Sequence, residues 1–302
     1  MRGSRRIAAL AIPTVTVLAA SLLVVMNRPT PAATPERTPV PTSLPKGSTV
    51  TPNLPATPLP TLTPTSLPPT PTPFVYRIDP VEPPGALGIL NLHIANLSGP
   101  LPQEPVDPAD LRLPAARLRP QTGRFGEIRG TYRLTHLGSD YMNLAEDPLV
   151  PPSENAILAA AVYLERSTYA AIAVDMSGNV QMYLVTLETD AGPRQYLYCF
   201  AHLSPGSNEE AIAQARANGG HVAVMGYVTS VSPENPALSD MHIGVIDVAA
   251  LLAFTGRGNL RDGLVELFSD RPPRTNQAYP SIFVEPESIY PALQALLDEY
   301  TP

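Results

Sequence analysis

The sequence contains one cysteine in 302 residues and only five histidines. The single cysteine, Cys199, cannot form an internal disulfide, and its isolation excludes a zinc site built from several cysteines. We expect its thiol to lie in the core as a small apolar group. The main candidates for chemistry are therefore the histidines, at positions 93, 136, 202, 221 and 242.

Basic residues are also scarce outside the N-terminal region. Residues 1–73 hold six Lys or Arg and one Glu, a net charge of +5, which leaves 14 basic and 26 acidic residues over 74–302, a net charge of −12. Nucleic-acid binding requires a basic surface. We therefore expect no nucleic-acid partner for residues 74–302. The net negative charge of this part of the chain would also cause repulsion from other strongly anionic polymers.

Charged residues are absent from positions 7–26, an apolar run of twenty residues that directly follows Arg2, Arg5 and Arg6. A helix of this length, at about 1.5 Å per residue, matches a hydrocarbon layer of about 30 Å. The pattern predicts a single N-terminal membrane anchor over residues 1–27, with the arginines inside and the rest of the chain outside the cytoplasm. A cleaved signal peptide is the alternative, although its apolar run is usually about 7–15 residues. Both interpretations export the following domain.

Residues 28–73 are rich in proline and threonine, with 15 Pro and 12 Thr among 46 positions. Proline at this density opposes helices and sheets and favours extended polyproline II structure. At about 3.1 Å per residue such a linker could reach about 140 Å when fully extended. One interpretation is that the linker lets the domain act at a distance from the membrane, for instance within a cell wall. The other is that it is a solvated stalk that only separates the domain from the lipid surface.

The rest of the chain is predicted to be mainly β, with antiparallel strands and a few short helices. Proline interrupts residues 74–130, which we expect to be an irregular preamble with one strand over 86–94, before a domain over 131–302. Apolar and β-branched runs predict strands at 157–164, 170–174, 180–187, 196–200, 221–231 and 242–248. Turns are expected at 175–179 and 190–193, and helices at 207–217 and 291–300.

Three of the histidines occur in a suggestive series. His136 and Asp140 form an H-x-G-x-D element, and His202 follows an apolar run in an aromatic-x-His-Leu segment. Asp240 and His242 are two residues apart, so on a strand they would share a face. Two imidazoles and one carboxylate, with a fourth position open to water, are typical of a catalytic zinc site.

In this series the chain resembles the M23 family of zinc endopeptidases, the LytM-like or lysostaphin-like enzymes, over about residues 130–250. The resemblance implies a compact antiparallel β domain with an open groove, in which Zn²⁺ is bound by His136, Asp140 and His242. It also implies that His202 is one of two non-ligand histidines that polarise water and stabilise the oxyanion. Residues 219–228 resemble the glycine-punctuated hairpin of the family, whose usual substrates are peptidoglycan cross-bridge peptides.

One departure from the family pattern concerns catalysis. Asp240 stands where the family has the first His of H-x-H, and Phe200 stands where it often has Tyr. An imidazole can donate a hydrogen bond to a developing oxyanion, whereas an ionised carboxylate only accepts. Asp240 could instead accept a proton from water or bind the metal as an extra ligand. With this departure, the resemblance supports metal binding better than it supports efficient catalysis.

These features lead to two functional hypotheses. The first is a membrane-tethered zinc endopeptidase that hydrolyses peptidoglycan peptides, with catalytic roles for His202 and Asp240. The second is a degenerate M23-like module that binds wall peptides or regulates a partner cell-wall hydrolase. A third interpretation, an unrelated β-sandwich binding domain, applies if the motif series is a coincidence. His93 and His221 match no ligand of the family, and we expect them to be structural or solvated.

Overall fold

The computed structural model describes residues 73–300, apart from gaps at 83–87, 100, 102–103, 121–122, 130–133, 145–146, 166–176, 230–237 and 270–280. The predicted anchor and nearly all of the predicted linker lie outside the described residues, as does the strand expected at 170–174. Within the described part of the chain, no helix is long and apolar enough to cross a membrane.

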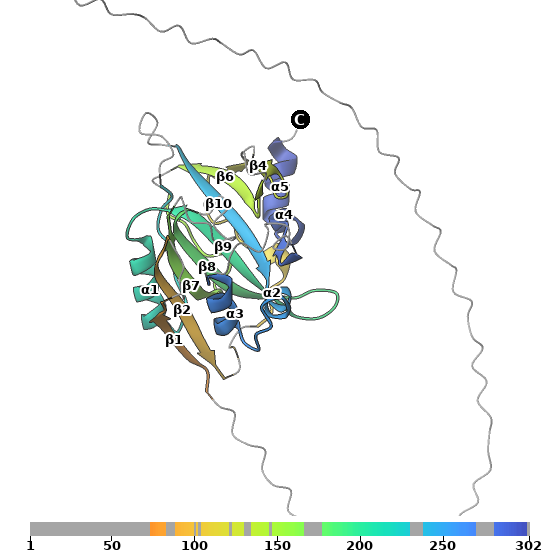
Figure 1. The fold of residues 1–302 in the computed structure, drawn as a ribbon. Coiled ribbons are helices and arrows are strands. Elements are labelled where there is room, and N and C mark those ends of the chain that lie inside the picture. The colour runs from red at the N-terminus through yellow and green to blue at the C-terminus, as the bar shows by residue number, and fades with distance from the viewer. Residues whose placement is uncertain are drawn as a thin grey trace, which may run out of the picture. The chain divides into compact units, whose positions relative to one another are not determined.

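A nine-stranded antiparallel sheet forms the centre of the fold (Figure 1). Its strands follow the order β1-β2-β7-β8-β9-β10-β6-β3, and β11 pairs with the end of β10 beyond β6. The strands are β1 (Val75–Pro80), β2 (Ile89–Ser98), β3 (Arg119–Pro120), β6 (Ser139–Leu144), β7 (Ile157–Leu164), β8 (Gly178–Leu187), β9 (Arg194–Leu203), β10 (Leu238–Asp247) and β11 (Phe283–Val284). A second, two-stranded sheet pairs β4 (Ile128–Arg129) with β5 (Leu134–Thr135).

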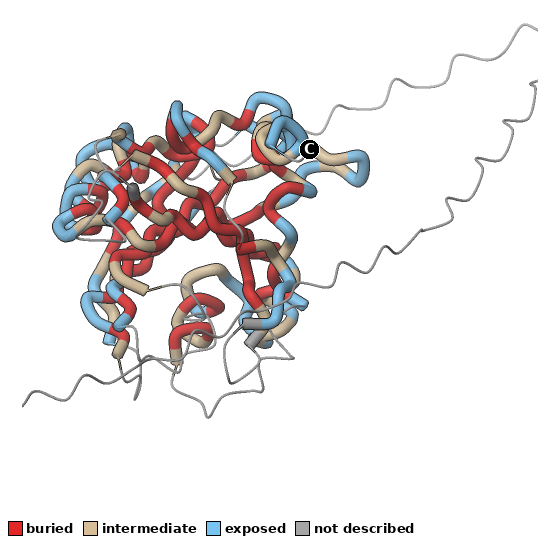
Figure 2. Tube along the Cα trace, turned by 90° about the horizontal axis from the view of Figure 1, so that it is seen from above, coloured by how far each residue is buried: buried red, intermediate tan, exposed pale blue. Residues whose placement is uncertain are grey.

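Short helices cover both faces of the large sheet. They are the 3₁₀ turn η1 (Pro108–Asp110) and the helices α1 (Ser207–Ala217), α2 (Val248–Thr255), α3 (Leu260–Leu267), α4 (Pro286–Ile289) and α5 (Pro291–Tyr300). Helices α1 and α5 pack into one apolar cluster, and α2 and α3 pack into the other. In Figure 2 the buried segments run through the middle of the fold and the exposed ones lie at its edges.

The two apolar clusters follow from the alternation of side chains along each strand. On β9, Tyr196, Tyr198 and Phe200 belong to the first cluster, while Leu197, Cys199 and Ala201 belong to the second. Successive side chains on a strand point to opposite faces, so a strand covered on both sides must be apolar throughout. The thiol of Cys199 is buried as expected, and burial raises its pKa above the usual range.

Several of the predicted elements are confirmed. The helices at 207–217 and 291–300 have the expected bounds, and β7, β8 and β9 contain the strands expected at 157–164, 180–187 and 196–200. The turn at 190–193 joins β8 to β9, where the Gly192 amide donates to the carbonyl of Thr189 at 2.8 Å.

Other expectations were wrong in bounds or type. Residues 221–229 form isolated bridges, from Gly226 to Leu149 and from Val228 to Leu203, instead of the expected strand and hairpin. The strand expected at 242–248 ends at Asp247, whose side chain accepts the Ala250 amide and starts α2. The expected irregular preamble supplies two strands of the main sheet: β1, which was not expected, and β2, which overlaps the single strand expected at 86–94.

Candidate metal centre

Two neighbouring strands bring distant residues of the histidine series together. His242 on β10 lies directly opposite Asp140 on β6 in an antiparallel pair. Directly opposed residues lie on the same face of a sheet. The next residues along, Tyr141 and Met241, point to the opposite face and belong to the first apolar cluster. His136 immediately follows β5, three residues before β6 begins, and its ring nitrogen lies 3.2 Å from the Asp140 carboxylate.

The three predicted ligand atoms form a nearly equilateral triangle. His136 Nε2 lies 3.0 Å from His242 Nδ1 and 3.2 Å from Asp140 Oδ1. His242 Nδ1 lies 3.1 Å from the same carboxylate oxygen. All three side chains are buried, and they form a group that could hold a metal ion. A point about 2 Å from every corner of such a triangle exists, which matches Zn–N and Zn–O bonds of about 2.0–2.2 Å.

Backbone groups of the preceding segment hold the first two ligands in place. His136 Nδ1 lies 3.0 Å from the carbonyl oxygen of Arg124, and the Asp140 amide donates to the carbonyl of Gly123 at 2.8 Å. The His136 amide donates to Glu127, and the Gly126 amide donates back to His136. A metal-binding histidine usually anchors its second ring nitrogen in this way.

The hydrogen-bonding chemistry of the cluster favours a cation. A carbonyl only accepts, so His136 Nδ1 carries the hydrogen and Nε2 of the neutral ring presents a lone pair. Asp140 is also an acceptor when ionised. The three contacts among His136 Nε2, His242 Nδ1 and Asp140 Oδ1 are 3.0–3.2 Å long. His242 Nδ1 can supply at most one hydrogen to them. A metal ion would accept the lone pairs of all three atoms at once.

The pKa values of the cluster suit ligands for a metal. Burial lowers the pKa of His242 to about 4, against the opposing effect of Asp140, so its imidazole is neutral near pH 7. Burial by itself would raise the pKa of Asp140, but the contacts with His136 and His242 outweigh it and hold this pKa well below its usual range. A neutral imidazole and an ionised carboxylate are the forms that bind metal.

Gly138, in the middle of the H-x-G-x-D element, makes the close packing possible. A Cβ atom at this position would lie 2.5 Å from His242 Nε2 and closer still to the carbonyl oxygen of Ile243. Real Cβ atoms essentially never approach backbone or ring atoms so closely. Glycine is therefore needed here because the chain between two ligands passes directly against the ring of the third.

His202 lies beside the cluster in a strained backbone conformation. Its φ angle is 63°, unusual for a residue other than glycine, and the pairing of β9 with β8 shifts register at this point. Bulges next to active sites often redirect a side chain. The His202 ring lies 6.4 Å from the His242 ring, centroid to centroid, and Nδ1 is 3.0 Å from the carbonyl oxygen of Ser177. Nδ1 therefore carries the hydrogen, and Nε2 of the neutral ring is a proton acceptor.

The remaining histidines lie away from this centre. His93 on β2 contacts the carbonyl of Asn91, and His221 follows α1; both are half-buried, and neither belongs to the metal-binding group found among the described residues. Asp240 is half-buried on β10, opposite Met142 and two residues before His242. Its predicted catalytic role remains a prediction, as does the open groove.

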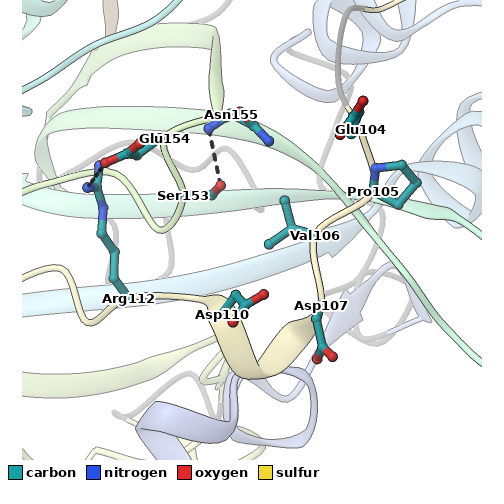
Figure 3. A pocket seen from close by; sticks show the side chains of 9 residues that line it. All are labelled: Glu104, Pro105, Val106, Asp107, Asp110, Arg112, Ser153, Glu154 and Asn155. Atoms are coloured by element: carbon teal, nitrogen blue, oxygen red, sulfur yellow. Dashed lines mark hydrogen bonds and ion pairs between the residues drawn. The ribbon is translucent and has the colours of Figure 1, made fainter.

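A cavity of about 400 Å³ lies elsewhere in the fold (Figure 3). It is lined by Glu104, Pro105, Val106, Asp107, Asp110, Arg112, Ser153, Glu154 and Asn155. Arg112 pairs with Glu154 at 3.4 Å across one side of it. His136, Asp140 and His242 do not line this cavity, so the candidate site is defined by their cluster and not by this pocket.

Comparisons of the chain with protein-family models, with curated proteins and with solved structures found no match. The structure itself establishes a buried His136–Asp140–His242 group that could hold a metal ion.

The sequence did not predict the partners that orient the imidazole rings of this site. The carbonyls of Arg124 and Ser177 bind the second nitrogens of His136 and His202, but a backbone carbonyl leaves no signature in a sequence. Glu287 was also missed, although it contacts both neighbours of Asp140. It lies 147 positions after Asp140, and only the tertiary fold places it behind the strand that carries Asp140.

Proposed function

We propose that this protein is a membrane-tethered zinc endopeptidase of M23 type that hydrolyses peptidoglycan cross-bridge peptides. The observation that carries the proposal is the triangle of two imidazole nitrogens and one carboxylate oxygen, 3.0–3.2 Å apart. Catalytic zinc sites use three protein ligands and keep a further position for water, whereas structural sites are usually closed by four. The H-x-G-x-D, Ala-His-Leu and Asp-x-His series that resembles the M23 family supplies all three ligands and the adjacent His202.

The donor set restricts the metal without naming it. Imidazole and carboxylate suit Zn²⁺, and two histidines with one carboxylate also suit Fe²⁺. We propose zinc because the resemblance to the M23 family implies it. Metal analysis of the purified protein should therefore cover zinc, iron, manganese and cobalt.

The chain's own residues account for proton movement in the proposed reaction. When bound, zinc would polarise the scissile carbonyl and lower the pKa of water to about 7. His202, held by Ser177 with its Nε2 lone pair available, is suited to accept a proton from the attacking water and then donate it to the leaving amine. Asp240 is a second acceptor on the same strand face as His242, but when ionised it cannot donate to an oxyanion.

A second function is favoured by that same carboxylate at position 240. Loss of an oxyanion donor typically costs about 10²–10³ in rate. A protein that keeps the ligand set but lacks one donor could bind wall peptides, or regulate a partner cell-wall hydrolase, without cleaving. This binding module is the alternative to the endopeptidase.

Metal removal separates the two functions. We expect the purified protein to release soluble peptides from isolated peptidoglycan, to lose this activity with a chelator, and to regain it with about one equivalent of zinc, because zinc activates the water. Hydrolysis that a chelator does not affect would contradict the proposal. Zinc binding together with retention on peptidoglycan, but without release of peptides, would select the binding module.

The proposed location depends on residues 1–73. We propose a single-pass anchor with the N-terminus inside and the globular domain extracytoplasmic. The full-length protein should remain in the membrane fraction after a high-salt wash, and external protease should release the globular part. A mature soluble protein that starts near residue 32 or 33 would show instead that the apolar run is a cleaved signal.

A further inference from the structure

The short helix α4 places a buried carboxylate behind the strand that carries Asp140. Glu287 is 5% exposed. It accepts the Tyr141 hydroxyl at 2.6 Å through Oε1 and the Ser139 hydroxyl at 3.0 Å through Oε2. Ser139 and Tyr141 are the two neighbours of Asp140 on β6, and they point away from the metal centre because side chains alternate along a strand. One carboxylate thus holds the strand on both sides of a ligand.

The same carboxylate also lies beside the segment that holds His136. Arg124 Nη1 is 4.0 Å from Glu287 Oε1. The carbonyl of Arg124 receives His136 Nδ1, and the carbonyl of the preceding Gly123 receives the Asp140 amide. Glu287 therefore contacts β6 directly and lies within ion-pair distance of the turn that orients the first two ligands, although it is not a ligand itself.

A carboxylate in this position needs an explanation, because burying a charge costs free energy unless it is well compensated. Two hydroxyl donors and a nearby guanidinium provide that compensation. An apolar residue would fill the space without this cost, but it could not fix the two hydroxyls on either side of Asp140.

We propose that Glu287 is a positioning residue for the metal centre. It sets the placement of β6 and of the turn at 123–124, so that His136 and Asp140 converge on His242. Metal affinity then depends on the docking of the C-terminal segment 281–300, which supplies no ligand. The inference rests on the proposed metal-binding function and extends it to a part of the chain outside the motif series.

The test measures metal binding in Glu287→Ala, with zinc affinity from chelator competition and the absorption spectrum of the cobalt-substituted protein. We expect zinc affinity to fall about 10–100-fold, the range found when an outer-shell partner of a ligand is removed. The cobalt spectrum should change because the ligand geometry changes. Glu287→Gln fills the same space and can still accept the Tyr141 hydroxyl, so it should recover most of the affinity.

Tyr290→Phe is the matched control. Tyr290 is fully buried in the same segment and donates to the carbonyl of Arg112, and among the described residues no hydrogen bond or ion pair joins its side chain to β6 or to Arg124. This variant should unfold at a lower temperature yet keep its zinc affinity within about twofold, because the neighbours of the ligands remain in place. If Glu287→Ala does not fold, Tyr141→Phe decides, with an expected loss of about threefold or more.

Three results would overturn the inference. They are unchanged zinc affinity in Glu287→Ala, an equal loss in Tyr290→Phe, and, where Glu287→Ala does not fold, unchanged affinity in Tyr141→Phe. A wild-type protein that binds neither zinc nor cobalt would instead defeat the proposed function. In that case the nuclear magnetic resonance signals of the His136 imidazole nitrogens would test whether Glu287 positions this ring. The Glu287→Ala substitution should shift them, and Tyr290→Phe should not.

Discussion

Replacing His242 with alanine is expected to abolish zinc binding, from about one zinc per chain to none detectable, because a three-ligand site loses one of its donors. His242 Nδ1 lies 3.0 Å from His136 Nε2 and 3.1 Å from Asp140 Oδ1, so its removal opens the triangle on two sides. The other two ligands remain held by the carbonyls of Arg124 and Gly123. The effect should therefore appear in metal content and not only in stability.

His221→Ala is the control for this experiment. It removes the same side chain from a half-buried position after α1, outside the metal-binding group. This variant should keep about one zinc per chain, because the three ligands are untouched. Metal content by mass spectrometry and the far-ultraviolet circular dichroism of each variant would separate loss of zinc from loss of fold. Stoichiometric zinc in the His242 variant would rule out the ligand assignment.

Changing Asp240 to histidine is expected to raise turnover about tenfold or more, because a new imidazole can donate to charge that develops in the transition state. The natural protein should then cleave wall peptides weakly if it is the endopeptidase, and not at all if it is the binding module. Position 240 lies two residues before His242 on β10, so the new ring would start from the same face of the sheet. The gain should appear in kcat and leave KM nearly unchanged, since the interaction forms mainly during reaction.

Initial-rate measurements on a defined cross-bridge peptide would test this expectation, with Asp240→Asn as the control that removes the charge without supplying an imidazole. Strong activity in the natural protein that is lost in Asp240→His would identify the carboxylate as the working base. Absence of activity in both forms, with zinc still bound, would support the binding module. A new side chain without supporting partners can fall short of the full effect.

Motif order was sufficient to predict that His136, Asp140 and His242 form one group that could hold a metal ion, because imidazole and carboxylate side chains are visible in the sequence. The missed helix α2 shows where such reasoning fails. Residues 248–255 are apolar, so they continue the pattern of the preceding strand. Their helical state is set by the Asp247 side chain at the N-terminus and by Gly256, with φ 67°, at the C-terminus. Both residues are visible in the sequence, but the expected strand at 242–248 ran past Asp247 and no helix was predicted after it.

The sequence by itself determined the β-rich class of the domain, its single buried thiol and the three side chains that form a group able to hold a metal ion. Only the tertiary structure decided that residues 75–98 join the main sheet and that Asp140 pairs with His242 across 102 positions. It also decided which carbonyls orient the imidazoles and that Glu287 lies behind β6. The physical reason is that side-chain periodicity is a local property, whereas strand pairing and buried polar contacts join segments whose separation along the chain carries no pattern.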